Sequence, residues 1–148
     1  MGLRRFVPIV LFVLALALVA CGSRDIVRYI PDEGGEYGAD DLQALLMSAD
    51  LTGVSTVSAT DAPESRQQAL SELRLHGEDA AALADTLTSD FPTDVSAVPV
   101  IVELATYESQ PAWIVIEAAA DDQGTLGYRR LWVFSLEQRT VLAAQSGR

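Results

Sequence analysis

The chain has 148 residues, which is enough for one small domain and too few for two. It carries 21 acidic and 10 basic residues, and its formal net charge is −11. Because nucleic-acid binding needs clustered basic side chains that neutralise phosphates, this composition excludes nucleic acid as an expected partner.

Residues 1–20 have the order of charge and hydropathy that is typical of an export signal. Arg4 and Arg5 precede an apolar run over residues 6–20. That run is shorter than the roughly 20 residues that a transmembrane helix needs, and no basic cluster follows it. We therefore predict a signal peptide over residues 1–20 that is cleaved, with an uncleaved anchor helix as an alternative.

The leader ends in Leu18, Val19, Ala20 and Cys21. This sequence resembles the lipobox of bacterial lipoproteins, in which an aliphatic residue, a small or β-branched residue and a Gly, Ala or Ser precede a Cys. In that family the thiol receives a diacylglyceryl group and a peptidase cuts before the Cys. The resemblance implies lipid attachment at Cys21, as S-diacylglycerol, with N-acylation of the new amino terminus left open. It also explains a lone cysteine, which cannot form an internal disulfide.

The same resemblance implies a location. A lipoprotein is held by acyl chains of the palmitate type, and two chains give stable attachment where one is marginal. We therefore expect a protein on the cell membrane that faces outward and has the membrane itself as a partner. Gly22, in place of Asp, follows the Cys. The sorting habit of the family then favours the outer membrane in a host with two membranes.

Residues 21–38 are predicted to be the lipidated N-terminus and a flexible tether. Gly34, Gly35, Gly38 and Pro31 lie among charged residues, a composition that buries too little apolar surface to order a chain. The apolar residues within 26–30 are left open as contacts to the membrane interface or to the domain. A single domain is expected over 39–148.

Helical spacing of apolar residues begins at Ala39 and predicts a first helix that Asp40 or Asp41 caps and that ends at Gly53 or just before it. Residues 51–60 are left open as a short strand or a loop. A second helix is predicted to begin at Asp61, with Asp61 and Glu64 forming a capping box. Over 70–76 the pattern fits either the end of this helix or a short strand.

A third helix is predicted to begin at Glu78 and to end at Phe91-Pro92. The last third of the chain then changes to the alternation of strands, over 98–107, 112–119, 128–136 and 140–145. The gaps between these strands are too short for helical crossovers, so the strands are expected to be antiparallel neighbours. The predicted class is α+β: a signal helix, a tether, and two to three helices on one side of a C-terminal meander of about four strands.

Residues suited to catalysis are few. His76 is the only histidine, no Ser lies in a Gly-x-Ser-x-Gly turn, and no glycine-rich phosphate loop is present. We therefore expect no enzyme activity, no cofactor and no metal. The alternative is an envelope hydrolase that uses carboxylates near His76.

Acidic residues gather in two places, and four aromatic residues gather in the meander. We expect the acidic residues to form a solvated surface, with cation binding as an alternative. The aromatic residues are expected in the core or on a half-buried sheet face in preference to a ligand platform. The acidic residues are Asp32, Glu33, Glu36, Asp40, Asp41, Asp121 and Asp122, and the aromatic ones are Trp113, Tyr128, Trp132 and Phe134.

Together these observations predict a lipid-anchored, exported lipoprotein whose domain is a non-catalytic module. Its partner would be an envelope protein or a cell-wall component. The sequence leaves the ligand, the pathway and the oligomeric state open.

Overall fold

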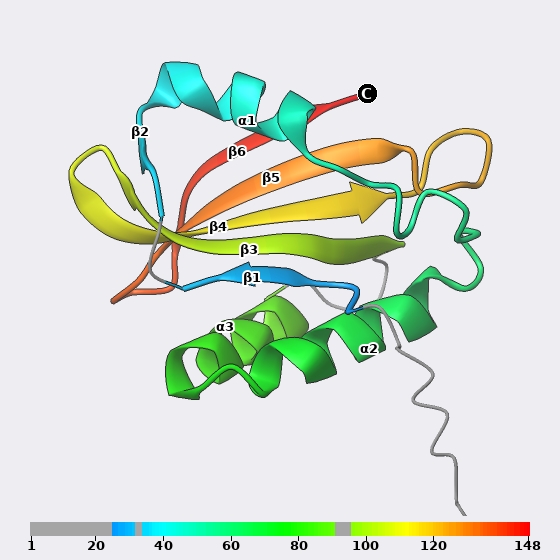
Figure 1. Cartoon of the computed structure of the whole chain (residues 1–148), viewed down its shortest axis with the longest axis horizontal. Coiled ribbons are helices and arrows are strands. Elements are labelled where there is room, and N and C mark those ends of the chain that lie inside the picture. Colours follow the sequence, from blue (N-terminus) through cyan, green and yellow to red (C-terminus); the bar gives the residue numbers. More distant parts are fainter. Residues whose placement is uncertain (1–24, 32–33, 91–95) are drawn as a thin grey trace, which may run out of the picture.

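The structure is a computed structural model that describes residues 25–31, 34–90 and 96–148. In these ranges, three α-helices and a short 3-10 helix pack on a mixed sheet of six strands (Figure 1). The α+β class is therefore confirmed. The predicted signal peptide and Cys21 lie outside the described residues.

The C-terminal third forms the expected antiparallel meander, because each strand alternates its side chains and each connection is short. Glu108 and Ser109 connect the first two of these strands and both have positive φ, at 47° and 68°. Positive φ at both central residues is the geometry of the tightest hairpin turns. The strands are β3 (Ala97–Tyr107), β4 (Gln110–Ala119), β5 (Tyr128–Ser135) and β6 (Val141–Gly147).

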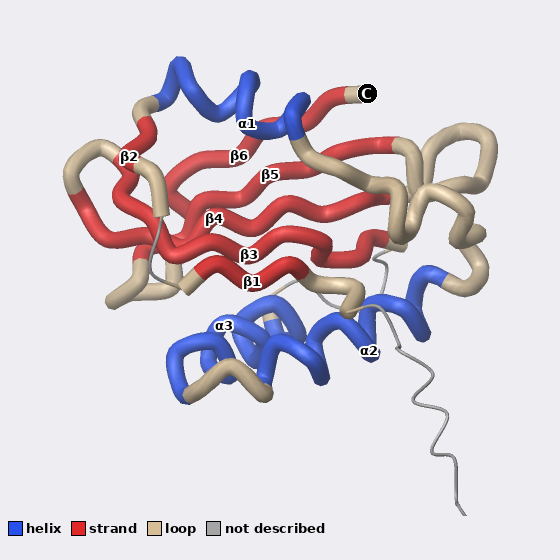
Figure 2. The backbone as a smooth tube through the Cα atoms, in the orientation of Figure 1, coloured by secondary structure: helices blue, strands red, loops and turns tan. Residues whose placement is uncertain are grey.

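Two further strands correct the prediction of a flexible tether. β1 (Arg28–Ile30) and β2 (Glu36–Tyr37) both pair with β3, in parallel, along the same edge (Figure 2). Within the predicted tether, the structure describes residues 25–31 and 34–38, and residues 21–24 and 32–33 lie outside the description. Residues 28–30 and 36–37 of the predicted tether are therefore built into the sheet.

The segment before β1 is held by contacts that are distant in sequence. Val27 is 3% exposed and belongs to the core. The Glu72 carboxylate accepts hydrogen bonds from the backbone amides of Ile26 and Val27, at 2.7 and 3.2 Å. Composition alone indicates disorder here because it does not register partners that lie elsewhere in the chain.

The helices cover both faces of the sheet, which corrects the prediction that they lie on one side (Figure 1). The Arg66 side chain binds Glu117, whereas Arg129, which is paired with Ala118, donates to the carbonyl of Ala49 just after the first helix. Glu117 and Ala118 are neighbours on one strand and point to opposite faces. The helices are η1 (Ala39–Asp41) and α1 (Leu42–Ser48) on one face, and α2 (Ala62–Arg74) and α3 (Glu78–Ser89) on the other.

The helix at 70–76 continues to Arg74, so the strand alternative for these residues is wrong. Leu75 and His76 follow in a turn, where the amide of His76 donates to the carbonyl of Leu73 at 3.1 Å. α3 then begins after Gly77, whose φ of 110° is costly for other residues. Residues 51–60 form turns with one isolated bridge, from Ser58 to Thr125.

The predicted capping box is wrong. No side-chain hydrogen bond caps α2, and the Asp61 carboxylate accepts instead from the Ser58 hydroxyl at 2.7 Å. Before α1, the Asp41 carboxylate similarly accepts from the amide of Gly38, at 2.8 Å. Both carboxylates therefore stabilise the turn that leads into a helix.

The strand alternation deduced from the sequence is confirmed on β4, and both of its faces are buried. Ile114 and Ile116 pack on the α1 side, and Trp113 and Val115 on the side of α2 and α3. Among the residues that the structure describes, no helix is both long and apolar enough to cross a bilayer.

Candidate functional site

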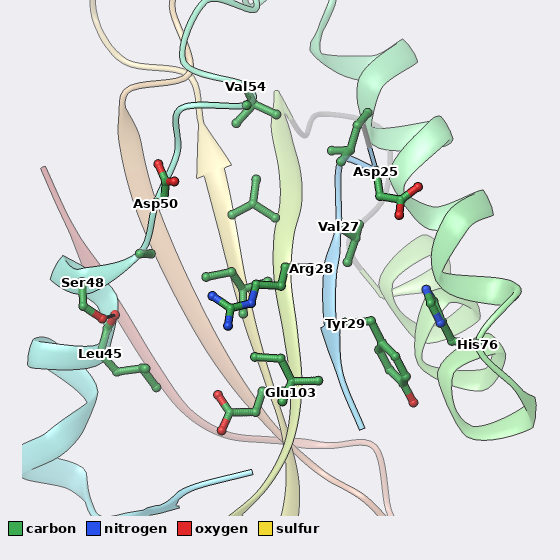
Figure 3. A pocket seen from close by; sticks show the side chains of 16 residues that line it. Asp25, Val27, Arg28, Tyr29, Leu45, Ser48, Asp50, Val54, His76 and Glu103 are labelled. Carbon is green, nitrogen blue, oxygen red and sulfur yellow. Dashed lines mark hydrogen bonds between the residues drawn. The ribbon is translucent and has the colours of Figure 1, made fainter. Parts of the chain in front are cut away.

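A cavity of about 730 Å³ lies along the β1 edge of the sheet, and we call it the β1 cavity (Figure 3). Its walls come from α1, the turn that follows α1, residues 25–30 with β1, and the first half of β3. His76 also lines it, on the α2 side of β1, so the cavity extends to both sides of this edge strand. This volume is within the range of small-molecule sites, about 300–1,000 Å³. The cavity is therefore large enough for a small ligand.

The cavity exists because one face of the sheet is only partly covered. α1 has seven residues and contacts β5 and β6. α2 packs against β3 on the opposite face. The α1-facing side of β1 and β3 is thus left without a helix above it, and the turn after α1 closes only its rim.

Glu103 lies on β3 in the wall of the β1 cavity and is 6% exposed. Its Oε1 atom accepts hydrogen bonds from the amide of Gly35 at 2.8 Å and from the Tyr37 hydroxyl at 3.1 Å. Partial burial, together with the negative charge and hydrogen bond of Glu103, raises the pKa of Tyr37 above its usual value. The phenol therefore stays protonated and remains a donor to Glu103 at neutral pH.

Gly34 allows this arrangement. A Cβ at this position would overlap the carbonyl oxygen of Leu104, so only glycine can approach β3 this closely. The close approach brings the amide of Gly35 and the side chain of Tyr37 within reach of Glu103. The glycine-rich segment thus positions donors around a buried carboxylate.

Arg28 of β1 is the cationic side chain in the cavity wall on the α1 side, and it is exposed (Figure 3). In the described part of the chain it forms no ion pair. Asp50 lies at the rim, where its carboxylate accepts hydrogen bonds from the hydroxyl and the amide of Thr52. These two bonds lower the pKa of Asp50.

A second buried carboxylate, Glu117, lies on the opposite face of the sheet and is 1% exposed. Its Oε1 atom accepts from Arg66 at 2.8 Å, and its Oε2 atom accepts from Arg130 at 3.1 Å and from the Trp132 indole at 2.9 Å. Arg66 also donates to the backbone carbonyls of Leu87 and Ala97. This network joins α2, α3 and three strands around the buried Glu117 carboxylate, and Arg130 and Trp132 are its partly exposed members.

His76, the candidate for catalysis, lies on the α2 side of β1 (Figure 3). Its ring stacks on Tyr29, with 4.3 Å between ring centroids, and Tyr29 in turn lies 6.1 Å from Trp113. No hydrogen bond or ion pair joins the His76 side chain to a carboxylate among the residues described. Its visible role is to pack the α2–α3 corner against β1.

Those acidic residues of the cation-binding alternative that the structure describes do not form a cluster. Asp121 accepts from Thr125 and Gln123 within its own turn, and these bonds lower its pKa, with the amide of Thr125 as the main cause. Asp122 pairs with Arg148 at 2.6 Å. In the described ranges, no three potential metal-ligating side chains gather. Glu36, Asp40 and Asp41 are exposed, and Asp32 and Glu33 lie outside the described residues.

The four aromatic residues of the meander lie where they were expected. Trp113 and Phe134 are buried, and Tyr128 and Trp132 are partly exposed. All four belong to the face that α2 and α3 cover. They contribute to the core and to the Glu117 network.

Sequence reasoning did not identify Arg28 and Glu103. Glu103 had one visible signal, because it is an acidic residue in the middle of an apolar strand and is therefore placed on a buried face. Arg28 had none, because it lies in a segment whose composition indicates a tether.

No protein-family model, curated protein or solved structure matches the chain.

Proposed function

We propose that this protein is a bacterial lipoprotein that is cleaved before Cys21 and anchored on the outer side of a membrane through that residue. The observation that carries the proposal is the sequence Leu18 to Cys21 behind a basic and then an apolar segment. The anchor would be an S-diacylglyceryl group, with further acylation of the amino terminus as an additional step. Two or more chains give stable attachment.

The fold limits how far the domain could lie from a lipid on Cys21. Ile26 is hydrogen-bonded to Glu72 of α2, and it lies only five positions after Cys21. A chain of that length spans at most about 18 Å even when fully extended. A lipid on Cys21 would therefore hold the β1 edge, and the β1 cavity beside it, close to the membrane surface.

The domain is proposed to be a non-catalytic binding module for an envelope component. What supports this is the β1 cavity, which combines an apolar floor with a few charged side chains of both signs. The hydrolase alternative would require a carboxylate that acts with His76. In Figure 3 β1 lies between His76 and Glu103, so these two side chains face opposite sides of the sheet.

Labelling with an alkyne-bearing palmitate in intact bacterial cells tests the anchor. We expect the natural chain to be labelled and to have the mass of the processed form. Cys21→Ser should remove the label completely and leave the chain at its precursor mass, because no thiol is present for diacylglycerol transfer. Equal labelling of both chains would contradict the proposal.

A second variant tests whether the residues before Cys21, in addition to its thiol, are needed for lipid attachment. Ala20→Asp keeps Cys21 but places a charged residue where the lipobox has Gly, Ala or Ser. We expect this chain to stay unlabelled and unprocessed. Full labelling of this variant would show that the sequence before Cys21 does not direct the modification.

A further inference from the structure

We propose that the β1 cavity binds a small zwitterionic amine, with its ammonium group on Glu103 and its anionic group on Arg28. A free amino acid with an apolar side chain has this chemistry, and so does a phosphoethanolamine headgroup. The inference rests on the proposed binding function and specifies its ligand.

The first step is that, among the described residues, Glu103 lacks a positively charged partner. Both Glu103 and Glu117 are carboxylates of the sheet that are more than nine-tenths buried. Glu117 has two arginine partners, whereas Glu103 has no cation among the described residues. A buried charge is costly unless it is paired. A cationic group from a ligand would supply that pair.

The second step is the free acceptor on this carboxylate. The Oε1 atom of Glu103 already accepts two hydrogen bonds, from Gly35 and Tyr37. Its Oε2 atom accepts none from the described part of the chain. Since Glu103 lines the β1 cavity, this oxygen is placed to accept from an ammonium group there.

The third step is the anionic end. Arg28 is paired with Ile101, two positions before Glu103 on the neighbouring strand, so both charged side chains belong to the same face. Figure 3 shows both in the cavity, on the side toward α1. They form no ion pair with each other. Two opposite charges in one cavity suit a ligand that carries both an ammonium and a carboxylate or phosphate, and a guanidinium binds such anions through two parallel bonds.

The fourth step is the apolar floor. Ile30, Leu45 and Ile101 are partly exposed in the cavity, and Val54 closes it at 2% exposure. Such a floor accommodates the side chain of a ligand such as leucine. The net charge of −11 also favours the approach of the ammonium end.

The test is calorimetric titration of the full chain in detergent micelles. The probes are L-leucine, isoamylamine, which lacks the carboxylate, 4-methylpentanoate, which lacks the ammonium, and phosphoethanolamine. We expect L-leucine or phosphoethanolamine to bind at least about tenfold more tightly than either single-charge analogue, since each charged hydrogen bond contributes about that factor. The tighter of the two zwitterions identifies whether the anion is a carboxylate or a phosphate.

Two variants test which residue binds the ammonium group of the ligand and which binds its anionic group. Glu103→Gln should weaken the zwitterion at least about tenfold and leave 4-methylpentanoate unchanged, because only the ammonium loses its partner. Arg28→Gln should weaken the zwitterion and leave isoamylamine unchanged. Asp85→Asn is the control: it removes one negative charge from the exposed Arg74–Asp85 pair and should leave the affinity for every probe unchanged. The melting temperature of each variant shows that it is folded.

Three results would overturn the proposal. The first is that neither zwitterion binds at millimolar concentration, and the second is that Glu103→Gln binds as tightly as the natural chain. The third is that Arg28→Gln and Glu103→Gln lower the melting temperature equally and non-additively, which would mean that the two side chains pair with each other. A labelled Cys21 without ligand binding rejects this ligand and keeps the anchor, and an unlabelled Cys21 with binding rejects the anchor alone.

Discussion

Replacing Arg66 with methionine is expected to lower the free energy of unfolding by about 3–5 kcal/mol. Arg66 is 8% exposed, and its guanidinium donates to Glu117 and to the carbonyls of Ala97 and Leu87. Methionine keeps most of the apolar stem but leaves one carboxylate oxygen and two carbonyls without their donor. Burying such groups without partners is what destabilises the variant.

Urea unfolding followed by tryptophan fluorescence measures this change, and an exposed arginine provides the control. Arg74 pairs with Asp85 at 2.9 Å, but their side chains are 38% and 71% exposed. Arg74→Met should therefore cost less than about 1 kcal/mol. Similar losses for the two variants would mean that the Glu117 network does not hold α2 and α3 on the sheet.

Leu46→Ala is expected to lower the free energy of unfolding by about 2–5 kcal/mol. Leu46 is fully buried on α1, which packs on β5 and β6. Truncation leaves a cavity between α1 and the sheet, which short helices close poorly. The same urea experiment measures the loss.

The neighbouring residue is the matched control. Met47 is 44% exposed on the same helix, so Met47→Ala should cost less than about 1 kcal/mol. A small loss for Leu46→Ala, equal to that of Met47→Ala, would contradict the packing of α1 on the second face.

The meander and the last two helices were predictable because their signals are local. Strand alternation and short turns define β3 to β6, and helical spacing defines α2 and α3. The position of α1 on the second face had a signal too, since Trp113 and Val115 on one side of β4 and Ile114 and Ile116 on the other are all apolar. A strand that is apolar on both faces needs cover on both.

β1 and β2 could not be predicted because their stability comes from distant partners. Gly35 and Glu103 are 68 positions apart, and Ile26 and Glu72 are 46 positions apart. The β1 cavity could not be predicted for the same reason, since Arg28 and Glu103 come to one face of the sheet only after β1 pairs with β3. Local composition records neither pairing.

The fold also changes what a lipid anchor would do. A flexible tether to residue 38 would let the domain stand away from the membrane, whereas pairing of β1 with β3 leaves only a short chain before the folded part. A ligand of the β1 cavity would then be bound beside the membrane surface. The lipid anchor and the proposed ligand site would then lie at the same end of the molecule.

The intact mass of the protein purified from membranes tests the anchor most directly. We predict a chain that begins at Cys21 and carries the added mass of a diacylglyceryl group, with or without a third acyl chain. A chain that begins at Met1, or one with an unmodified thiol at Cys21, would contradict this account.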